Sequence, residues 1–209
     1  DLLIMTKDLL IVFVKNPALG KAKTRLAATI GDKKALDIYQ VLLDKTKQET
    51  VGLGTDKVIY YSEFIDKNDL WDNDVYQKEL QVSGNLGEKI SAAFHKAFAD
   101  GYERICIIGS DCYDLTQQHL ATAFTALQTK QAVIGPAEDG GYYLLGISKL
   151  NPQLFENKNW STDTVGADTI KDFESLGMPY TILPTLNDID TEADLGNWAN
   201  HILEPSTNA

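Results

Sequence analysis

The chain has 209 residues, of which 44% are hydrophobic and 23% are charged, and its formal net charge at pH 7 is −11. This composition predicts one globular domain over residues 1–209, with residues 1–8 as an N-terminal extension and Met5 as a candidate natural start. The acidic excess argues against nucleic acid as a partner, because binding to phosphate backbones relies on clustered Lys and Arg. The sequence predicts no signal peptide and no membrane span, and its two cysteines, Cys106 and Cys112, favour a reducing, cytoplasmic environment.

Short β-rich runs alternate with amphipathic helical patterns along the chain. Strands are predicted at residues 9–15, 56–62, 78–83, 104–110, 131–137, 142–147 and 179–184. Apolar residues recur at helical spacing in the stripes Leu36/Tyr39/Leu43, Leu86/Ile90/Phe94/Phe98, Leu120/Phe124/Leu127 and Leu195/Trp198/Ala199/Ile202. This alternation predicts an α/β fold around a mostly parallel sheet. The pair Gly140–Gly141 joins two apolar runs as a tight reversal, so one strand is predicted to be antiparallel.

The segment after the first predicted strand, KNPALGKAKTRL (15–26), is a basic island in an acidic chain. Its cations are Lys15, Lys21, Lys23 and Arg25, and no carboxylate occurs from residue 9 to residue 31. Gly20 permits an irregular path, and the following residues look like the opening of a helix, whose N-terminus with Lys and Arg can cradle a phosphate. The Walker A and dinucleotide-binding glycine patterns are missing. The alternative is a solvated loop whose cations offset the acidic surplus.

Acidic residues follow three of the later predicted strands. They are Asp111 and Asp114, Glu138 and Asp139, and Asp188 and Asp190. Because ligands of open α/β sheets bind outside the carboxyl ends of the strands, we expect these residues to meet the basic loop at one edge. Mg²⁺ prefers one or two carboxylates with phosphate oxygens and water, a set that Asp111 and Asp190 would supply. The alternatives are a turn role for Asp111 and a capping box, Thr191 with Asp194, that starts the last helix beside Asp190.

Six motifs occur in a recognisable order along the chain. They are KNPALGKAKTRL (15–26), GNLGEKISAAF (84–94), IIGSDCYDL (107–115), EDGGYYLLG (138–146), WSTDTV (160–165) and NDIDTEADL (187–195). Together they resemble a bacterial family of nucleotide-diphospho-sugar transferases that is often described as glycosyltransferase-like. More distantly, they resemble the phospholactate and molybdenum-cofactor guanylyltransferases. The resemblance implies a GT-A-like, Rossmann-type three-layer α/β/α sandwich that binds a nucleotide diphosphate or triphosphate with Mg²⁺ or Mn²⁺.

The resemblance also implies which residues form the site. The implied catalytic residues are Lys23, Arg25 and Asp111. The implied nucleotide-binding residues are Lys15, Gly20, Lys21, Lys23, Arg25, Gly84, Gly87 and Glu88. The implied metal ligands are Asp111 and Asp190, with Asp188 a weaker candidate. The implied acceptor residues are Glu138, Asp139, Gly140, Gly141 and Trp160. The alternative roles are a hairpin turn for the Gly pair and a packed loop anchor for Trp160.

Two transfer reactions are compatible with these residues. In glycosyl transfer, the metal and the cations would stabilise a departing nucleoside diphosphate, and Glu138 or Asp139 would deprotonate an acceptor hydroxyl or face the sugar. In nucleotidyl transfer, a phosphorylated acceptor would attack the α-phosphorus of a nucleoside triphosphate. A non-catalytic nucleotide-binding protein is the alternative from another class. The expected partners are a nucleotide or nucleotide sugar and a small-molecule acceptor, and the sequence is compatible with a homo-oligomer.

Overall fold

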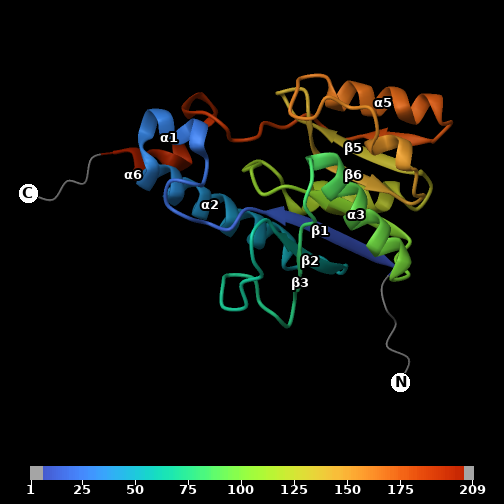
Figure 1. Cartoon of the computed structure of the whole chain (residues 1–209), viewed down its shortest axis with the longest axis horizontal. Helices are drawn as coiled ribbons and strands as arrows, with labels where there is room; N and C mark the ends of the chain where they lie inside the picture. The colour runs from blue at the N-terminus through green and yellow to red at the C-terminus, as the bar shows by residue number, and fades with distance from the viewer. Residues whose placement is uncertain (1–6, 205–209) are drawn as a thin grey trace, which may run out of the picture.

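A computed structural model of the chain describes residues 7–204, so Met5 and residues 1–6 of the expected extension lie outside the described part. It contains one seven-stranded sheet in the order β3-β2-β1-β4-β6-β5-β7 (Figure 1). The strands are β1 (Asp8–Val14), β2 (Asp56–Tyr61), β3 (Gln77–Leu80), β4 (Arg104–Ile108), β5 (Ala132–Pro136), β6 (Tyr142–Ile147) and β7 (Tyr180–Ile182). Strand β6 runs antiparallel to β4 and β5, and the other neighbouring strands are parallel.

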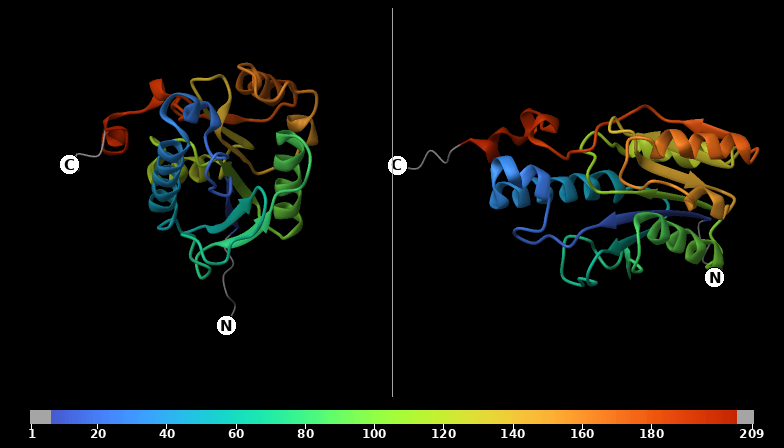
Figure 2. Two further views of the ribbon diagram at one scale, coloured as in Figure 1. Left: turned by 60° about the vertical axis from the view of Figure 1, so that its left-hand side comes forward. Right: turned by 45° about the horizontal axis from the view of Figure 1, so that its top comes forward.

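Helices cover both faces of this sheet. They are α1 (Thr24–Ile30), α2 (Asp32–Thr50), α3 (Leu86–Ala99), α4 (Gln117–Ala126), α5 (Val165–Ser175) and α6 (Asn200–Leu203), with 3-10 turns at Pro152–Phe155, Glu192–Asp194 and Asn197–Ala199. Helices α1, α2 and α4 share one core, and α3 and α5 share the other; Figure 2 shows α2 and α3 on opposite sides of the sheet. The three-layer α/β/α sandwich is therefore confirmed. None of the helices in residues 7–204 is long and apolar enough to cross a membrane.

The central strands β1 and β4 explain the position of the two cores. Both carry uninterrupted apolar runs because helices cover both of their faces. Successive side chains alternate, so Leu10 and Val12 join the core under α2, while Leu9 and Ile11 join the core under α3. Strands β1 and β4 are parallel neighbours, so their carboxyl ends lie at the same edge of the sheet.

All seven predicted strands are present, and β6 is the predicted antiparallel strand. The reversal before β6 uses Gly140 with a φ of 89°, a conformation that glycine adopts without strain. The backbone N–H of Ala137 donates to the carbonyl of Gly141 at 3.0 Å and closes the turn. The Gly pair therefore does form the hairpin turn.

The predicted final helix is wrong. The backbone is extended at Leu195 and Gly196, and the chain forms 3-10 turns and the four-residue α6 instead. The carboxylate of Asp194 accepts hydrogen bonds from the N–H groups of Asp190 and Thr191 at 3.0 and 2.7 Å, so the predicted cap stabilises a 3-10 turn.

Helix α5 is present although it was not predicted, because no apolar stripe of the sequence analysis covers it. Its buried face runs through Val165, Gly166, Thr169 and Phe173, so its middle positions carry a glycine and a threonine. The hydroxyl of Thr169 donates to the carbonyl of Val165 at 2.7 Å, which satisfies it inside the core. A helical stripe with small or polar residues at its centre gives little apolar periodicity in the sequence.

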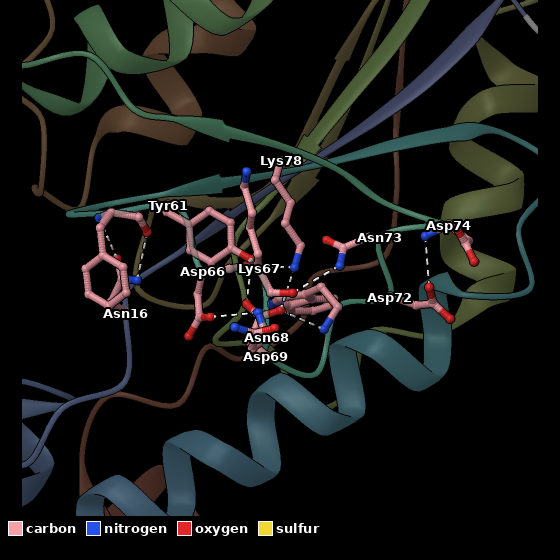
Figure 3. A network of polar contacts seen from close by, with 12 residues as sticks. Asn16, Tyr61, Asp66, Lys67, Asn68, Asp69, Asp72, Asn73, Asp74 and Lys78 are labelled. Atoms are coloured by element: carbon pink, nitrogen blue, oxygen red, sulfur yellow. Dashed lines mark hydrogen bonds and ion pairs between the residues drawn. The ribbon is translucent and has the colours of Figure 1, made fainter.

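The long connection between β2 and β3 is held by the polar network of Figure 3. The Nζ of Lys78 on β3 donates to Oδ1 of Asp69 at 2.8 Å and to the carbonyl of Asp66 at 2.7 Å. The hydroxyl of Tyr61, at the end of β2, donates to the same two residues. The side chains of Lys78 and Asp69 are only 6% and 15% exposed, so this is a largely buried ion pair that fastens the connection to the sheet.

Candidate active site

The basic loop after β1 meets two acidic loops at the carboxyl edge of the sheet. The Nζ of Lys23 lies 3.2 Å from Oδ1 of Asp111, the residue that closely follows β4. The guanidinium of Arg25 forms an ion pair with Asp190, which follows β7. The N–H of Ile189 donates to the carbonyl of Asp111 at 2.8 Å and joins the two acidic segments to each other. Residues from three distant parts of the chain thus form one charged cluster.

Lys23 has an unusual backbone conformation. Its φ of 51° and ψ of 54° are left-handed, a region that costs a residue with a side chain about 1–2 kcal/mol. Lys23 occupies the N-cap position of α1, and its side chain is only 9% exposed. Strained residues of this kind concentrate at functional sites, where surrounding contacts hold them in place. Here the conformation aims the ammonium group at Asp111 instead of at solvent.

Two buried polar residues hold the start of the basic loop. The hydroxyl of Tyr39 on α2 donates to the carbonyl of Lys15 at 2.9 Å and accepts from the Lys15 N–H at 2.8 Å. The Oδ1 of Asn16 accepts from the N–H of Glu63 at 3.0 Å, which ties the loop to the connection after β2. Burial raises the pKa of Tyr39 to about 12, so its hydroxyl keeps its proton and can donate.

We expect Tyr39→Phe to lower the free energy of unfolding by about 1–3 kcal/mol, because it leaves the carbonyl and N–H of Lys15 without their shared partner. Urea denaturation of the variant and the wild type would measure the difference. Tyr180→Phe is the matched control, since the hydroxyl of Tyr180 bonds to Glu174 at the surface. An unfolding free energy for Tyr39→Phe equal to that of the control would show that Tyr39 does not anchor the loop.

The carboxyl group of Asp188 has a raised pKa. Burial, the largest cause, and the charges of Asp111 and Asp139 together raise its pKa to about 7, while Lys23 opposes the shift. The sequence favoured Asp190 over Asp188 as a metal ligand. The structure brings both close to Asp111, so three carboxylates lie together beside Lys23 and Arg25.

Asp111 and Asp190 can bind a divalent metal ion only if other ligands complete its coordination. Within residues 7–204, no group of three or more Asp, Glu, His or Cys side chains is arranged to hold a metal ion by itself. Asp111 and Asp190 instead pair with Lys23 and Arg25. Mg²⁺ binds through one or two carboxylates completed by phosphate oxygens and water, and Mn²⁺ shares its preference for oxygen ligands. The donor set fits such an ion only when a phosphate-bearing ligand supplies the rest.

Two adjoining cavities open at this edge, with volumes of about 550 and 630 Å³. The charged cluster lines both of them through Lys23, Arg25, Asp111, Asp188 and Asp190. The first cavity extends between the end of β1 and the start of α3, and the second extends beneath the segment that leads into α5. A ligand that spans the two cavities would therefore pass directly over the charged cluster.

The predicted site residues divide between lining and supporting positions. Lys15 lines the first cavity, and Asp139, Gly141 and Trp160 line the second. The predicted residues outside both linings are Gly20, Lys21, Gly84, Gly87, Glu88, Glu138 and Gly140.

Several of the residues outside the linings have structural contacts. Lys21 pairs with Glu63 at 3.7 Å. The carboxylate of Glu88 accepts from the N–H of Asn85 at 2.7 Å, and the Asn85 side chain accepts from the N–H of Glu88 at 2.9 Å. This is a capping box, so Glu88 stabilises the start of α3. A Cβ on Gly87 would lie 2.4 Å from the indole nitrogen of Trp160, so Gly87 leaves room for that ring.

Several residues that line the cavities were not singled out from the sequence. Among them are Lys89, Tyr142 and Asp163. Each of them lies inside or beside one of the recognised motifs, so their position near the site could have been inferred. Their orientation toward a cavity depends on how α3 and the hairpin pack on the sheet, which the motifs do not specify.

Neither cysteine supplies a nucleophile. Both are buried and unpaired. Burial raises the pKa of the Cys112 thiol to about 12, so the thiolate is not populated at neutral pH.

Structural comparison defines the class of the protein. A "putative nucleotide-diphospho-sugar transferase" from Desulfovibrio desulfuricans G20 is 33% identical and superposes with a TM-score of 0.81, over 90% of this chain and 84% of that one. This similarity supports a transferase with the nucleotide-diphospho-sugar transferase fold. The chain belongs to the family described as "Uncharacterized protein conserved in bacteria (DUF2064)", whose model matches residues 40–162. No curated protein matches the sequence significantly.

More distant structures share the fold. The inositol-1-phosphate CTP transferase from T. maritima superposes with a TM-score of 0.53 at 14% identity, over 95% of each chain. Rv0371C from Mycobacterium tuberculosis H37Rv, in a complex with manganese, superposes with a TM-score of 0.52 at 14% identity, over 96% of this chain and 100% of that one. Identities this low establish a common architecture and leave the reaction open.

Proposed function

We propose that this protein is a metal-dependent transferase that uses a nucleotide or a nucleotide sugar as its donor. The observation that carries the proposal is the meeting of Lys23 and Arg25 with Asp111, Asp188 and Asp190 at the boundary of two cavities. A phosphate group at this boundary would take the cations away from the aspartates and release carboxylate oxygens for a divalent ion. The transferase relative and the manganese complex of the same fold are consistent with this chemistry.

The first cavity suits the phosphates of the donor. Apart from the charged cluster that lines both cavities, the described residues that line the first cavity include Lys15 and Lys89 and no carboxylate. Lys15, Lys23 and Arg25 would hold the phosphate oxygens and stabilise the charge that develops on the leaving group. Mg²⁺ or Mn²⁺, when held by Asp111 and Asp190, supplies a Lewis acid for the same oxygens.

Glycosyl transfer is the reaction that uses all of these groups. The bond between the sugar carbon and the diphosphate oxygen breaks, the nucleoside diphosphate leaves with the bonding electrons, and an acceptor hydroxyl oxygen bonds to the carbon. Asp139 lines the second cavity and would accept the proton of that hydroxyl, whereas Glu138 lies outside the lining. Asp139 is fixed in place because its Oδ1 accepts from the N–H of Gly141 at 2.9 Å.

Nucleotidyl transfer is the second candidate, because the short basic loop also suits a triphosphate. An acceptor phosphate oxygen would then bond to the α-phosphorus, and pyrophosphate would leave with the bonding electrons. This reaction needs no protein base, so Asp139 would be dispensable for it.

Nucleotide binding with and without Mn²⁺ tests the proposal. We expect at least one nucleoside di- or triphosphate to stabilise the protein by about 2–3 kcal/mol at a concentration near 100 Kd, and only when Mn²⁺ or Mg²⁺ is present. Thermal unfolding with each nucleotide and with EDTA as the control would measure this. Stabilisation by no nucleotide under any of these conditions would overturn the proposal.

Product analysis then separates the reactions. Release of nucleoside diphosphate from a nucleotide sugar would identify glycosyl transfer, and release of pyrophosphate in the presence of an acceptor would identify nucleotidyl transfer. Metal-dependent binding with neither product would favour a non-catalytic nucleotide-binding protein.

A further inference from the structure

The two aspartates proposed as metal ligands are placed by their loops and not by burial. The side chains of Asp111 and Asp190 are each 46% exposed. Asp190 also lies well beyond the end of β7 at Ile182, so the sheet does not fix its position. Among residues 7–204, no group of three or more Asp, Glu, His or Cys side chains is arranged to hold an ion by itself. Metal binding therefore depends on how the two loops are held relative to each other.

The segment that carries Asp190 is anchored at its start to the hairpin between β5 and β6. The N–H of Leu186 donates to the carbonyl of Pro136 at 3.1 Å. The N–H of Glu138 donates in turn to the carbonyl of Leu186 at 3.0 Å. These two bonds fix the chain up to a point shortly before Asp190.

An aromatic stack anchors the same segment at its far end. The indole of Trp198 lies on the ring of Tyr113, with ring centroids 4.1 Å apart and ring planes only 8° from parallel. Tyr113 closely follows Asp111 in the turn after β4, and Trp198 belongs to the 3-10 turn Asn197–Ala199 beyond Asp190. The stack therefore joins the loop of one proposed metal ligand to the loop of the other.

Both partners of the stack are themselves in contact with α2. The ammonium group of Lys45 on α2 lies 5.6 Å from the centroid of the Tyr113 ring. The Nζ of Lys34, also on α2, donates to the carbonyl of Leu203 in α6 at 3.0 Å, close to the turn that carries Trp198. Trp198 packs against the core that α2 and α4 share. The stack is therefore fixed to the body of the fold.

A backbone hydrogen bond joins the two loops between these anchors. The N–H of Ile189 donates to the carbonyl of Asp111 at 2.8 Å, and Ile189 directly precedes Asp190. The carboxylate of Asp194 accepts from the N–H groups of Asp190 and Thr191, which makes this part of the segment rigid. The bond from Ile189 therefore sets how closely the carboxylates of Asp111 and Asp190 can approach, and a stack that holds both loops keeps that bond closed.

From these contacts we propose that the stack of Trp198 on Tyr113 positions Asp111 and Asp190 for one divalent ion. Both aromatic residues lie outside the two cavity linings, so they act through the loops that they hold and not by contact with a ligand. This inference rests on the proposed function and adds two positioning residues to its metal site.

Hydrogen exchange of the Ile189 amide in the metal-free protein tests the first part of the inference. We expect Trp198→Ala to accelerate this exchange about tenfold, because the two loops can separate without the stack. Trp198→Phe keeps an aromatic ring on Tyr113 and should stay within about a factor of three of the wild type. The matched control is Asp69→Asn, which weakens the ion pair with Lys78 beside β3 and should leave the Ile189 amide unchanged.

Mn²⁺ titration of nucleotide binding tests the second part. The probe is the tightest binder among ADP, GDP, CDP, UDP and their triphosphates. We expect Trp198→Ala to raise the Mn²⁺ concentration for half-maximal binding about tenfold, as residues that orient metal ligands do. Excess Mn²⁺ should restore the nucleotide affinity of Trp198→Ala, because both carboxylates remain, but it should not restore that of Asp111→Ala.

A double-mutant cycle separates the stack from two independent packing effects. Tyr113→Ala should shift the Mn²⁺ requirement as far as Trp198→Ala does, and the double variant should shift it no further, because either change removes the same contact. Trp198→Leu keeps an apolar side chain without the stack, and it gives a measurable value if Trp198→Ala does not fold.

Two outcomes would overturn the inference. One is an Ile189 exchange rate and a Mn²⁺ requirement in Trp198→Ala or Trp198→Leu equal to those of the wild type, and the other is an equal shift in Asp69→Asn, which would indicate general instability. A wild-type protein that binds none of the nucleotides would instead overturn the proposed function. The Ile189 exchange rate would then still decide whether the stack holds the two loops together.

Discussion

Replacement of Asp111 by alanine is expected to lower kcat/KM for nucleotide turnover by at least about 10²–10³-fold. Asp111 closely follows β4, lines both cavities and pairs with Lys23, so its carboxylate lies where donor phosphates and a divalent ion would meet. Its backbone carbonyl, which accepts from Ile189, is unaffected by the substitution, so the neighbouring acidic segment keeps its attachment. Steady-state kinetics and Mn²⁺ titration of nucleotide binding would measure the loss.

Two further variants make the result specific to the carboxylate. Asp111→Asn keeps the shape of the side chain and removes its charge, so we expect it to lose metal-dependent binding nearly as fully as the alanine variant. Asp114→Ala removes an exposed carboxylate only three residues away that lies outside both linings, and we expect turnover within about a factor of two of the wild type. Unchanged metal-dependent binding in Asp111→Ala would remove the proposed metal site.

Asp69→Ala should lower the free energy of unfolding by about 3–5 kcal/mol, the largest stability change that we expect from a single substitution. It leaves the ammonium group of Lys78, whose side chain is 6% exposed, without its charged partner. It also removes one of the two acceptors for the hydroxyl of Tyr61 and the side-chain acceptor for the N–H of Trp71. Because most domains unfold with only about 5–15 kcal/mol, this loss is a large share of the total stability.

Urea denaturation would measure this change, and two variants in the same connection calibrate it. Asp69→Asn keeps an acceptor oxygen, so we expect a loss of about half that of the alanine variant, and it gives a measurable value if Asp69→Ala does not fold. Asp74→Ala alters an exposed aspartate and should change the unfolding free energy by less than about 0.5 kcal/mol. A change that small for Asp69→Ala would show that the network of Figure 3 does not stabilise the edge of the sheet.

The strands and most helices could be predicted from local sequence because their apolar periodicity is strong. The apolar runs of β1 and β4 and the stripe of α3 are examples. Prediction failed where the periodicity was misleading or absent. The last apolar stripe does not form one continuous helix, because the backbone is extended at Leu195 and Gly196. Helix α5 was not predicted, because Gly166 and Thr169 occupy its buried face.

Candidate site residues were predictable where residue type and position after a strand both pointed to the carboxyl edge. Lys23, Arg25, Asp111 and Asp190 all satisfied that rule, and the structure brings them together. Tyr39 does not satisfy this rule, because in the sequence it belongs to a helical core stripe. Its hydrogen bonds to Lys15 form only when α2 packs beside β1.

The sequence by itself determined the class of fold and the set of charged groups at one edge of the sheet. Both follow from local patterns: the alternation of strands and helices, and the position of each charged residue after a strand. The tertiary structure alone decided how those charges are distributed. Lys15 and Lys89 line one cavity, Asp139 and Asp163 line the other, and the charged cluster lines both. Electrostatic and hydrogen-bonding partners depend on distance in space, and packing sets that distance for residues far apart in the chain.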